Sequence, residues 1–249
     1  MASGVPTIFS PRRRAMRDAR AAGLQRHRSA PATWLHEAMA EDLIERIGFM
    51  RLEPRRALLI GAASLSVRPS LGAQCEVVHA DGADVRDTFE RGEFDLIVAT
   101  GWFDTLNDLP GALLLARLAL RDGGMLLATI PAAGSLPTLR RVMIAADGDR
   151  AAPRIHPQID NRAATMLLER AGFARQVVDG FGFDVRYGSL ARLVDDLREQ
   201  GQTSVLDSPG PALDKAALVR ARTAFASLAG EDGKTVEHFE LLTLTGWKS

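Results

Sequence analysis

The chain has 249 residues, of which 46% are hydrophobic and 25% are charged, a composition typical of a globular protein with one α/β domain and additions. Lys and Arg number 31, as do Asp and Glu, so the net charge of zero argues against nucleic acid as a partner. The single cysteine, Cys75, excludes an internal disulfide, and no apolar run is long enough to span a bilayer. We therefore expect a cytoplasmic protein without a transmembrane segment.

The N-terminal region is strongly basic. Ser10 followed by Pro11 predicts the start of a helix. Two interpretations stay open: a solvated helix face, or a surface that contacts an acidic protein or, peripherally, a membrane. Residues 1–30 hold one acid, Asp18, against seven arginines: Arg12, Arg13, Arg14, Arg17, Arg20, Arg26 and Arg28.

Apolar residues then recur at three- and four-residue steps over residues 34–50, which predicts a helix with one buried face. A buried strand is predicted at 57–60, and Pro69 and Gly72 discourage a regular helix over 62–73. Further strands are predicted at 76–80 and 94–100. Asp108 is the predicted N-cap of a helix over 109–120, which residues 122–124 end before a strand at 125–130.

The second half of the chain continues the alternation of helices and strands. Ser135 is predicted to cap a helix that ends at Ala146, and Asn161 a helix over 162–171. The remaining predictions are strands at 176–179, 183–187 and 238–245 and helices at 189–200 and 214–228. This order predicts a doubly wound, mostly parallel sheet with one antiparallel strand at its edge. We expect an N-terminal helical extension (1–52) and an α/β domain (53–249) with a helical insertion around 189–230.

From Glu93 onward the chain resembles the class I S-adenosylmethionine-dependent methyltransferases. The resemblance is to the branch of the respiratory complex I assembly-factor methyltransferase and the malonyl-acyl-carrier-protein methyltransferase of biotin synthesis. It rests on the order and spacing of several short segments rather than on one motif. These are residues 94–98, 107–113, Leu136 with 139–140, 153–155 with Pro157, 167–168, 170–173, 178–179, Tyr187, 196–197 and 245–247.

The resemblance implies a Rossmann-like fold, S-adenosylmethionine as cofactor, and methyl transfer to a small-molecule or protein acceptor. The turn after the first strand would approach the methionine part of the cofactor, and Asp81 would bind either the ribose or the adenine. The implied cofactor residues are Gly61, Ala62, Asp81, Thr100 and Gly101, and the implied substrate residues are Asp104, Asn107, His156 and Tyr187. The sequence identifies no catalytic residue, and its histidines and lone cysteine show no metal-ligand spacing.

Several features depart from the family pattern. Only Gly61 remains of a Gly-x-Gly turn, and Ala62 and Ala63 add methyl groups where a backbone should approach a ligand. A gap filled by the side chains of Ala62, Ala63 and Leu65 would favour an inactive protein, and a nucleoside-sized cavity bordered by Asp81 and Thr100 would favour an enzyme. One strand–helix unit, the second or the third, is missing between the first strand and Phe94. Residues 103–106 replace a segment in which relatives carry a histidine, at the position of Asp104, and a tryptophan.

These departures leave two hypotheses. The first is a methyltransferase; the second is a catalytically inactive binding or assembly module, for example for a respiratory complex subunit. A Rossmann oxidoreductase is a distant third because no Gly-x-Gly-x-x-Gly is present. Several of these residues could have a structural role instead. Asp81 could be a helix N-cap, and His79 and His156 could be ordinary core, edge or loop histidines. Trp102 and Phe103 could simply pack in the core.

Overall fold

The computed structural model describes residues 6–81, 84–89 and 92–249. Its strands form one six-stranded sheet in the order β2-β1-β3-β4-β6-β5. The strands are β1 (Arg56–Ile60), β2 (Glu76–Ala80), β3 (Phe94–Thr100), β4 (Leu120–Pro131), β5 (Arg175–Tyr187) and β6 (Thr235–Trp247). The α-helices are α1 (Pro11–His27), α2 (Trp34–Phe49), α3 (Leu109–Ala119), α4 (Pro137–Asp147), α5 (Asn161–Arg170), α6 (Leu190–Glu199) and α7 (Lys215–Ala226). Three short 3-10 helices complete the fold: η1 (Ala62–Leu71), η2 (Asp84–Thr88) and η3 (Phe103–Thr105).

The chain divides into two compact units. Unit 1 comprises the described residues of Met1–Thr33 with Ala132–Gln158 and Gly182–Glu240. Unit 2 comprises the described residues of Trp34–Pro131 with Ile159–Phe181 and Leu241–Ser249. Helix α2 therefore groups with unit 2, although it precedes the predicted boundary at residue 52; the division into an extension and a domain stays a prediction.

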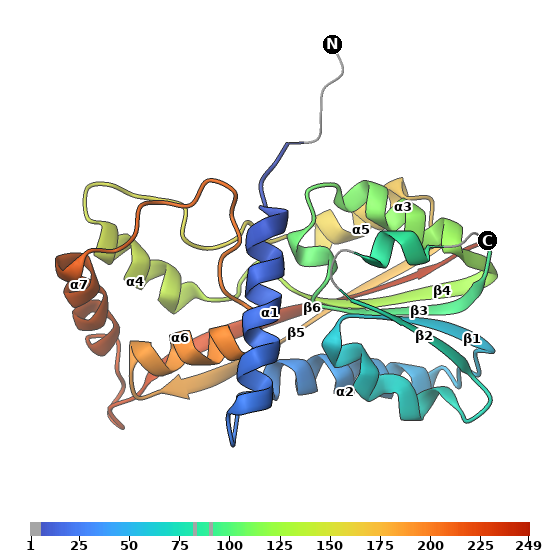
Figure 1. Ribbon diagram of the computed structural model, residues 1–249, viewed down its shortest axis with the longest axis horizontal. Helices are drawn as coiled ribbons and strands as arrows, with labels where there is room; N and C mark the ends of the chain where they lie inside the picture. The colour runs from blue at the N-terminus through green and yellow to red at the C-terminus, as the bar shows by residue number, and fades with distance from the viewer. Residues whose placement is uncertain (1–5, 82–83, 90–91) are drawn as a thin grey trace, which may run out of the picture. The chain divides into compact units, whose positions relative to one another are not determined.

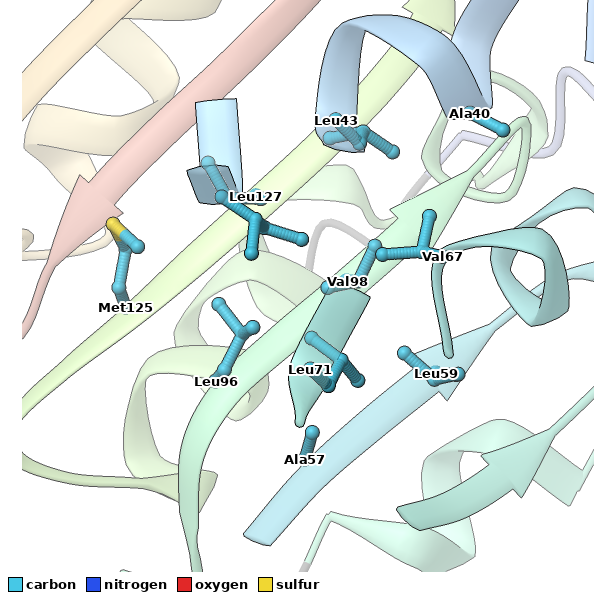
Figure 2. Packing of buried hydrophobic residues seen from close by; sticks show 11 residues of the cluster. Ala40, Leu43, Ala57, Leu59, Val67, Leu71, Leu96, Val98, Met125 and Leu127 are labelled. Atoms are coloured by element: carbon cyan, nitrogen blue, oxygen red, sulfur yellow. The ribbon is translucent and has the colours of Figure 1, made fainter. Parts of the chain in front are cut away.

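In unit 2, parallel strands β1, β3 and β4 are buried on both faces. Residues 57–60 of β1 are fully buried, as a continuous apolar run predicts for the middle of a parallel sheet. Helix α2 and η1 cover one face, and α3 and α5 lie on the other (Figure 1). Figure 2 shows the core between the sheet, α2 and η1, formed by Ala40, Leu43, Ile47, Ala57, Leu59, Val67, Leu71, Leu96, Val98, Met125 and Leu127.

The predicted loss of one strand–helix unit is confirmed for the described residues, which hold one strand between β1 and β3. That strand, β2, pairs directly and in parallel with β1, from Arg56 opposite Glu76 to Ile60 opposite Ala80. In the doubly wound order 3-2-1-4-5-6, the neighbour of the first strand is the second. The missing strand is therefore the third, and β2 forms one edge of the sheet.

The last strands differ from the prediction. Strand β6 is antiparallel to β4, as expected, but it lies inside the sheet, and β5 occupies the edge. The two strand segments predicted at 176–179 and 183–187 form the single strand β5. Strand β6 is longer than 238–245 because its second half, including Leu241, Leu242 and Leu244, is buried continuously instead of alternating.

Two predicted helix caps are wrong. The Ser135 hydroxyl donates to the Glu240 carbonyl (2.8 Å) and accepts from its N–H (2.8 Å), so Ser135 anchors β6 and α4 begins after Leu136. Helix α5 is capped by Asp160, which accepts from the Ala163 N–H (2.7 Å), while the Asn161 amide donates to the Val178 carbonyl. The predicted cap at Asp108 is confirmed: its carboxylate accepts from the Gly111 N–H at 2.9 Å.

Among the described residues, no helix has both the length and the apolar character needed to cross a membrane.

Candidate functional site at the carboxyl ends of β1 and β3

The order of the strands marks a switch point in unit 2. From β1 the chain passes to β2 on one side and then to β3 on the other side of β1. In open α/β sheets, ligands bind outside the carboxyl ends of the strands that flank such a point. Gly61 follows β1, and Thr100 ends β3. Both residues therefore lie at the place where this fold would bind a ligand.

Gly61 has no room for a side chain. Its φ of 87° and ψ of 155° lie in a region that only glycine adopts readily. A Cβ atom here would lie 2.4 Å from the carbonyl oxygen of Thr100 and 3.1 Å from its Oγ1. The Gly61 N–H donates to the Ala80 carbonyl (3.2 Å). The ends of β1, β2 and β3 are therefore drawn together around a glycine that an alanine cannot replace.

Thr100 carries a buried hydroxyl at the same place. Its exposed fraction is 5%, and its Oγ1 has no hydrogen-bond partner within the part of the chain that the structure describes. Gly101 follows with a φ of 59°, and its N–H donates to the Thr129 carbonyl (2.9 Å). An unsatisfied buried hydroxyl costs about 1–3 kcal/mol, so the Thr100 hydroxyl is a candidate for a partner outside the described residues.

The side chains of the turn after Gly61 are only partly buried. Ala62 is exposed, and Leu65 keeps 45% of its surface exposed, so of the three side chains that could fill the space only Ala63 is buried. Ser64 is fully buried and donates its hydroxyl to the Gly61 carbonyl (2.5 Å). The side chains of Ala62 and Leu65 are therefore not packed into the core beside Gly61.

Asp81 comes directly after β2 and is exposed. Because β2 pairs with β1, Asp81 lies at the carboxyl end of the strand next to Gly61. In the family pattern, an acidic residue at the end of the second strand would bind the ribose, and one at the end of the third strand would lie beside the adenine. The position of Asp81 corresponds to the first of these. The alternative of Asp81 as an N-cap involves residues 82 and 83, which lie outside the described residues.

Residues 101–108 form a fixed segment after β3. Trp102 and Phe103 are buried, with ring centroids 5.0 Å apart and planes at 81°, so they pack against each other, as their structural alternative predicts. Asp104 and Asn107, the implied substrate residues, are both half-buried in this segment. Thr105, which the sequence analysis did not single out, is 2% exposed and also carries a hydroxyl without a hydrogen-bond partner among the described residues.

The other two implied substrate residues belong to unit 1. His156 accepts a hydrogen bond from the Val205 N–H at Nε2 (2.7 Å) and meets the edge of Phe9. Burial, together with the charges of Arg17 and Arg13, lowers the pKa of His156 to about 4. The imidazole is therefore neutral at pH 7, and the lone pair of Nε2 is engaged by the backbone.

Tyr187 is 2% exposed. Burial raises the pKa of its phenol above the ordinary value, and the Asp196 carboxylate raises that pKa further. The residues that contact His156, Val205 and Phe9, belong to unit 1, and so does Asp196, which lies beside Tyr187.

The described residues contain no group of three or more His, Cys, Asp or Glu side chains that could hold a metal ion. Cys75 packs against the core of unit 2, and burial raises the pKa of its thiol. His79 is exposed on the edge strand β2.

The chain is similar in sequence to several proteins of known name. No protein-family model matches the chain. It is 27% identical over 216 residues to the mitochondrial arginine hydroxylase NDUFAF5 of Danio rerio, covering 85% of this chain and 64% of that protein. It is 28% identical over 154 residues to the malonyl-[acyl-carrier protein] O-methyltransferase of Xylella fastidiosa, covering 61% and 51%. The chain thus spans from 48% to 64% of the length of the curated relatives it matches.

Solved structures share the fold. The YcgJ protein of Bacillus subtilis matches with a TM-score of 0.54 at 12% identity, covering 85% of this chain and 98% of that one. A methyltransferase-like protein of Bacillus halodurans matches with a TM-score of 0.50 at 12% identity, covering 82% and 96%. By sequence, the chain is similar to NDUFAF5 and the malonyl-[acyl-carrier protein] O-methyltransferases, and it shares the α/β fold of these solved structures.

Proposed function

We propose that the chain binds S-adenosylmethionine at the carboxyl ends of β1 and β3 and transfers its methyl group to a small-molecule or protein acceptor. The observation that carries this proposal is the contact of Gly61 with Thr100 at the switch point. Gly61 leaves no space for a side chain, and Thr100 presents a buried hydroxyl for which the described residues supply no partner. Both features fit a backbone and a polar group that face a bound molecule.

The roles within this site follow from the chemistry of each residue. Gly61 and Ala62 form the turn that approaches the methionine part of the cofactor, and Thr100 and Gly101 border it from β3. Asp81 suits a ribose because one carboxylate accepts hydrogen bonds from two hydroxyl groups. When bound, S-adenosylmethionine supplies an activated methyl group on a sulfonium. Aligning the acceptor atom with that group can provide most of the rate without a catalytic acid or base.

The acceptor side of the proposal includes Asp104 and Asn107, which lie in the segment that follows Thr100. His156 and Tyr187, the other two residues proposed for substrate binding, belong to unit 1, and their assignment rests on the family resemblance alone. His156 is engaged by the Val205 N–H, and Tyr187 is enclosed beside Asp196. The named relatives include an arginine hydroxylase and an O-methyltransferase. Relatives of this chain therefore act on different groups, and cofactor binding is the first property to test.

Isothermal titration with S-adenosylmethionine and S-adenosylhomocysteine tests the proposal, with Thr100→Val and Thr129→Val as matched variants. The Thr100 hydroxyl has no partner among the described residues, so we expect Thr100→Val to leave the melting temperature unchanged or raised and to weaken binding about tenfold. Thr129 hydrogen-bonds Thr243 (3.0 Å) inside the sheet, so Thr129→Val should lower the melting temperature and keep the affinity. Absence of heat and of thermal stabilisation in the wild-type protein at millimolar ligand would overturn the proposal.

The alternative, an inactive binding or assembly module, rests on one observation: the described residues hold a single strand between β1 and β3. Its proposed contact with a protein partner is the basic helix α1. Several arginines there already bind their own chain: Arg13 donates to the Ser204 carbonyl, Arg20 to Thr203 Oγ1, and Arg28 pairs with Glu199. The exposed Arg12 and Arg26 would meet an acidic partner. We also propose a cytoplasmic location, because a chain with a single cysteine suits a reducing compartment.

A further inference from the structure

Helices α4 and α7 lie next to each other in unit 1, at the left of Figure 1. The Arg220 side chain of α7 donates to the Ala146 carbonyl in the last turn of α4 (3.1 Å), which holds the two helices side by side. Each helix buries one stripe of apolar side chains, so its opposite face is exposed to solvent. The buried residues are Leu139, Val142 and Ala146 in α4 and Ala217, Ala221 and Phe225 in α7.

The exposed faces of α4 and α7 are basic. Four of their exposed cations have no carboxylate partner in the part of the chain that the structure describes. These are Arg140 and Arg141 in α4 and Lys215 and Arg222 in α7. The two helices contain one acidic residue, Asp147, whose carboxylate pairs with Arg154 at 2.5 Å. The charge of the four cations is therefore not neutralised within either helix.

Other acidic residues near the two helices are engaged elsewhere or lie past the helix ends. Asp214 is the N-cap of α7, Asp232 is in an ion pair, and Glu237 is fully buried. Asp149 and Glu231 are exposed, but they come after the last residues of α4 and α7. The exposed faces between the helix ends therefore carry a positive potential.

An aliphatic side chain is exposed among the cations of each helix. Ile144 in α4 is 59% exposed and lies one turn after the two arginines of that helix. Val219 in α7 is 60% exposed and lies between Lys215 and Arg222. Side chains three or four residues apart share one side of a helix, so each aliphatic group is flanked by positive charge. Such a combination is typical of helices that lie on a membrane surface.

We propose that the exposed faces of α4 and α7 form a docking surface for an anionic membrane. The four cations bind the lipid headgroups, and Ile144 and Val219 enter the boundary between the headgroups and the acyl chains. The basic helix α1 fits this role less well, because Arg13, Arg20 and Arg28 already bond their own chain. The proposal goes beyond methyl transfer and does not depend on the cofactor site.

A lipid surface fits this face better than an acidic protein does. Protein interfaces are usually anchored by aromatic side chains that fill pockets. The exposed residues that the structure describes in α4 and α7 include no aromatic residue, since Phe225 is buried. A bilayer needs no pocket on the protein, and cations with short aliphatic groups are enough to hold a protein on it.

A first experiment measures co-sedimentation with vesicles of phosphatidylcholine alone and of equal parts phosphatidylcholine and phosphatidylglycerol. We expect the wild-type protein to bind only the anionic vesicles. The double variant Arg140→Gln with Arg141→Gln should lose at least about tenfold in affinity. The matched control, Arg162→Gln with Arg170→Gln on α5, removes the same charge from exposed positions elsewhere and should lose less than about twofold. Absence of binding by the wild-type protein, or equal losses in the two double variants, would overturn the proposal.

A second experiment places an environment-sensitive fluorophore on Val219→Cys or on Met166→Cys of α5, both in the Cys75→Ser background. The two positions are matched in exposure, at 60% and 59%. We expect anionic vesicles to shift the emission of the label at residue 219 to shorter wavelength and to leave the label at residue 166 unchanged. Equal shifts, or a shift at residue 219 with soluble poly-glutamate but not with vesicles, would overturn the proposal. Cofactor binding is measured separately, so failure here leaves the proposed function intact.

Discussion

At the scale of single residues, Gly61 and Gly72 offer a natural comparison. They precede and follow η1 with nearly the same backbone, φ 87° and ψ 155° against φ 82° and ψ 151°. A Cβ at Gly72 would meet nothing within 4 Å, whereas at Gly61 it would meet the Thr100 carbonyl at 2.4 Å. We expect Gly72→Ala to lower the free energy of unfolding by about 1–2 kcal/mol, the cost of the backbone conformation alone.

Gly61→Ala adds a steric clash to that backbone cost, so we expect a loss of about 3 kcal/mol or more. Urea unfolding of both variants measures the difference. Equal losses for Gly61→Ala and Gly72→Ala would mean that β1 and β3 can separate freely at the switch point. In that case, the packing of Gly61 against Thr100 would no longer support a ligand site.

His156 predicts a pH dependence of stability. Its pKa in the folded protein, about 4, lies below the ordinary value of 6.5, so the unfolded chain binds more protons between these values. Stability from this group is therefore complete above pH 6.5 and is lost as the pH falls toward 4. We expect His156 to contribute a loss of about 2 kcal/mol between pH 7 and pH 5.

The variant His156→Gln isolates this contribution, because its amide oxygen can take the place of Nε2 and accept the Val205 N–H without titrating. We expect the difference in urea unfolding free energy between pH 7 and pH 5 to shrink by about 2 kcal/mol in the variant. An unchanged difference would show that the imidazole is already protonated at pH 5 in the folded protein.

At the scale of secondary-structure elements, the start of α3 shows a coupled pair. Asp108 caps the helix by accepting from the Gly111 N–H, and a Cβ at Gly111 would lie 2.1 Å from Asp108 Oδ2. An alanine inside a helix normally gains about 1 kcal/mol over glycine. Here we expect Gly111→Ala to destabilise the protein by about 1 kcal/mol instead, because it displaces the cap.

A double-mutant cycle tests this coupling. Asp108→Ala alone should lose about 1 kcal/mol of unfolding free energy. In the Asp108→Ala background, Gly111→Ala no longer displaces a carboxylate and should become neutral or stabilising. If the effects of the two substitutions simply add in thermal or urea unfolding, the cap and the glycine are independent, and the steric explanation is wrong.

Local patterns predicted most elements of this fold but not the choice between neighbouring caps. Asp108 was correctly predicted because its partner lies three residues away along the chain. Ser135 instead bonds both polar backbone groups of Glu240, and Asn161 donates to Val178. Those partners come from strands distant in sequence, so nothing near Ser135 or Asn161 could reveal them. The continuous burial of β6 has the same origin, since its neighbours β4 and β5 are known only from the sheet order.

In the candidate site, too, some features could be predicted from the sequence and others depend on packing between distant segments. The glycine turn and the end of β3 could be predicted because they follow apolar runs, and the family resemblance gave their order. The close approach of Gly61 to Thr100, and the burial of the Thr105 hydroxyl, depend on packing between segments. The sequence also could not tell which alanine after Gly61 is buried: Ala62 is exposed, and Ala63 is buried.

At the scale of the whole molecule, a buried ion pair holds the N-terminal helix in unit 1. Glu199 at the end of α6 is fully buried, pairs with Arg28, and accepts the Ala32 N–H at 2.5 Å. Removing Arg28 leaves a buried carboxylate without its counter-charge. Because Arg28 itself is partly exposed, water can replace part of its effect, and we expect Arg28→Ala to lose about 2 kcal/mol.

Two further variants make this prediction specific. Arg26→Ala, a change of an exposed arginine on the same helix, should stay within about 0.5 kcal/mol of the wild-type protein. Adding Glu199→Gln to Arg28→Ala should restore part of the loss, because a neutral amide needs no counter-charge. If urea unfolding shows no recovery in the double variant, charge burial is not the cause of the loss.

The position of β6 inside the sheet has a consequence for protein synthesis. Strand β4 pairs with β6, Met125 opposite Trp247 and Pro131 opposite Leu241, but α4, α5, β5, α6 and α7 are made between the two strands. Until the ribosome has released β6, one side of β4 keeps its backbone N–H and C=O groups unpaired. An apolar strand in that condition attracts strands of other nascent chains. This border of β4 is therefore open to mispairing until the closing strand emerges.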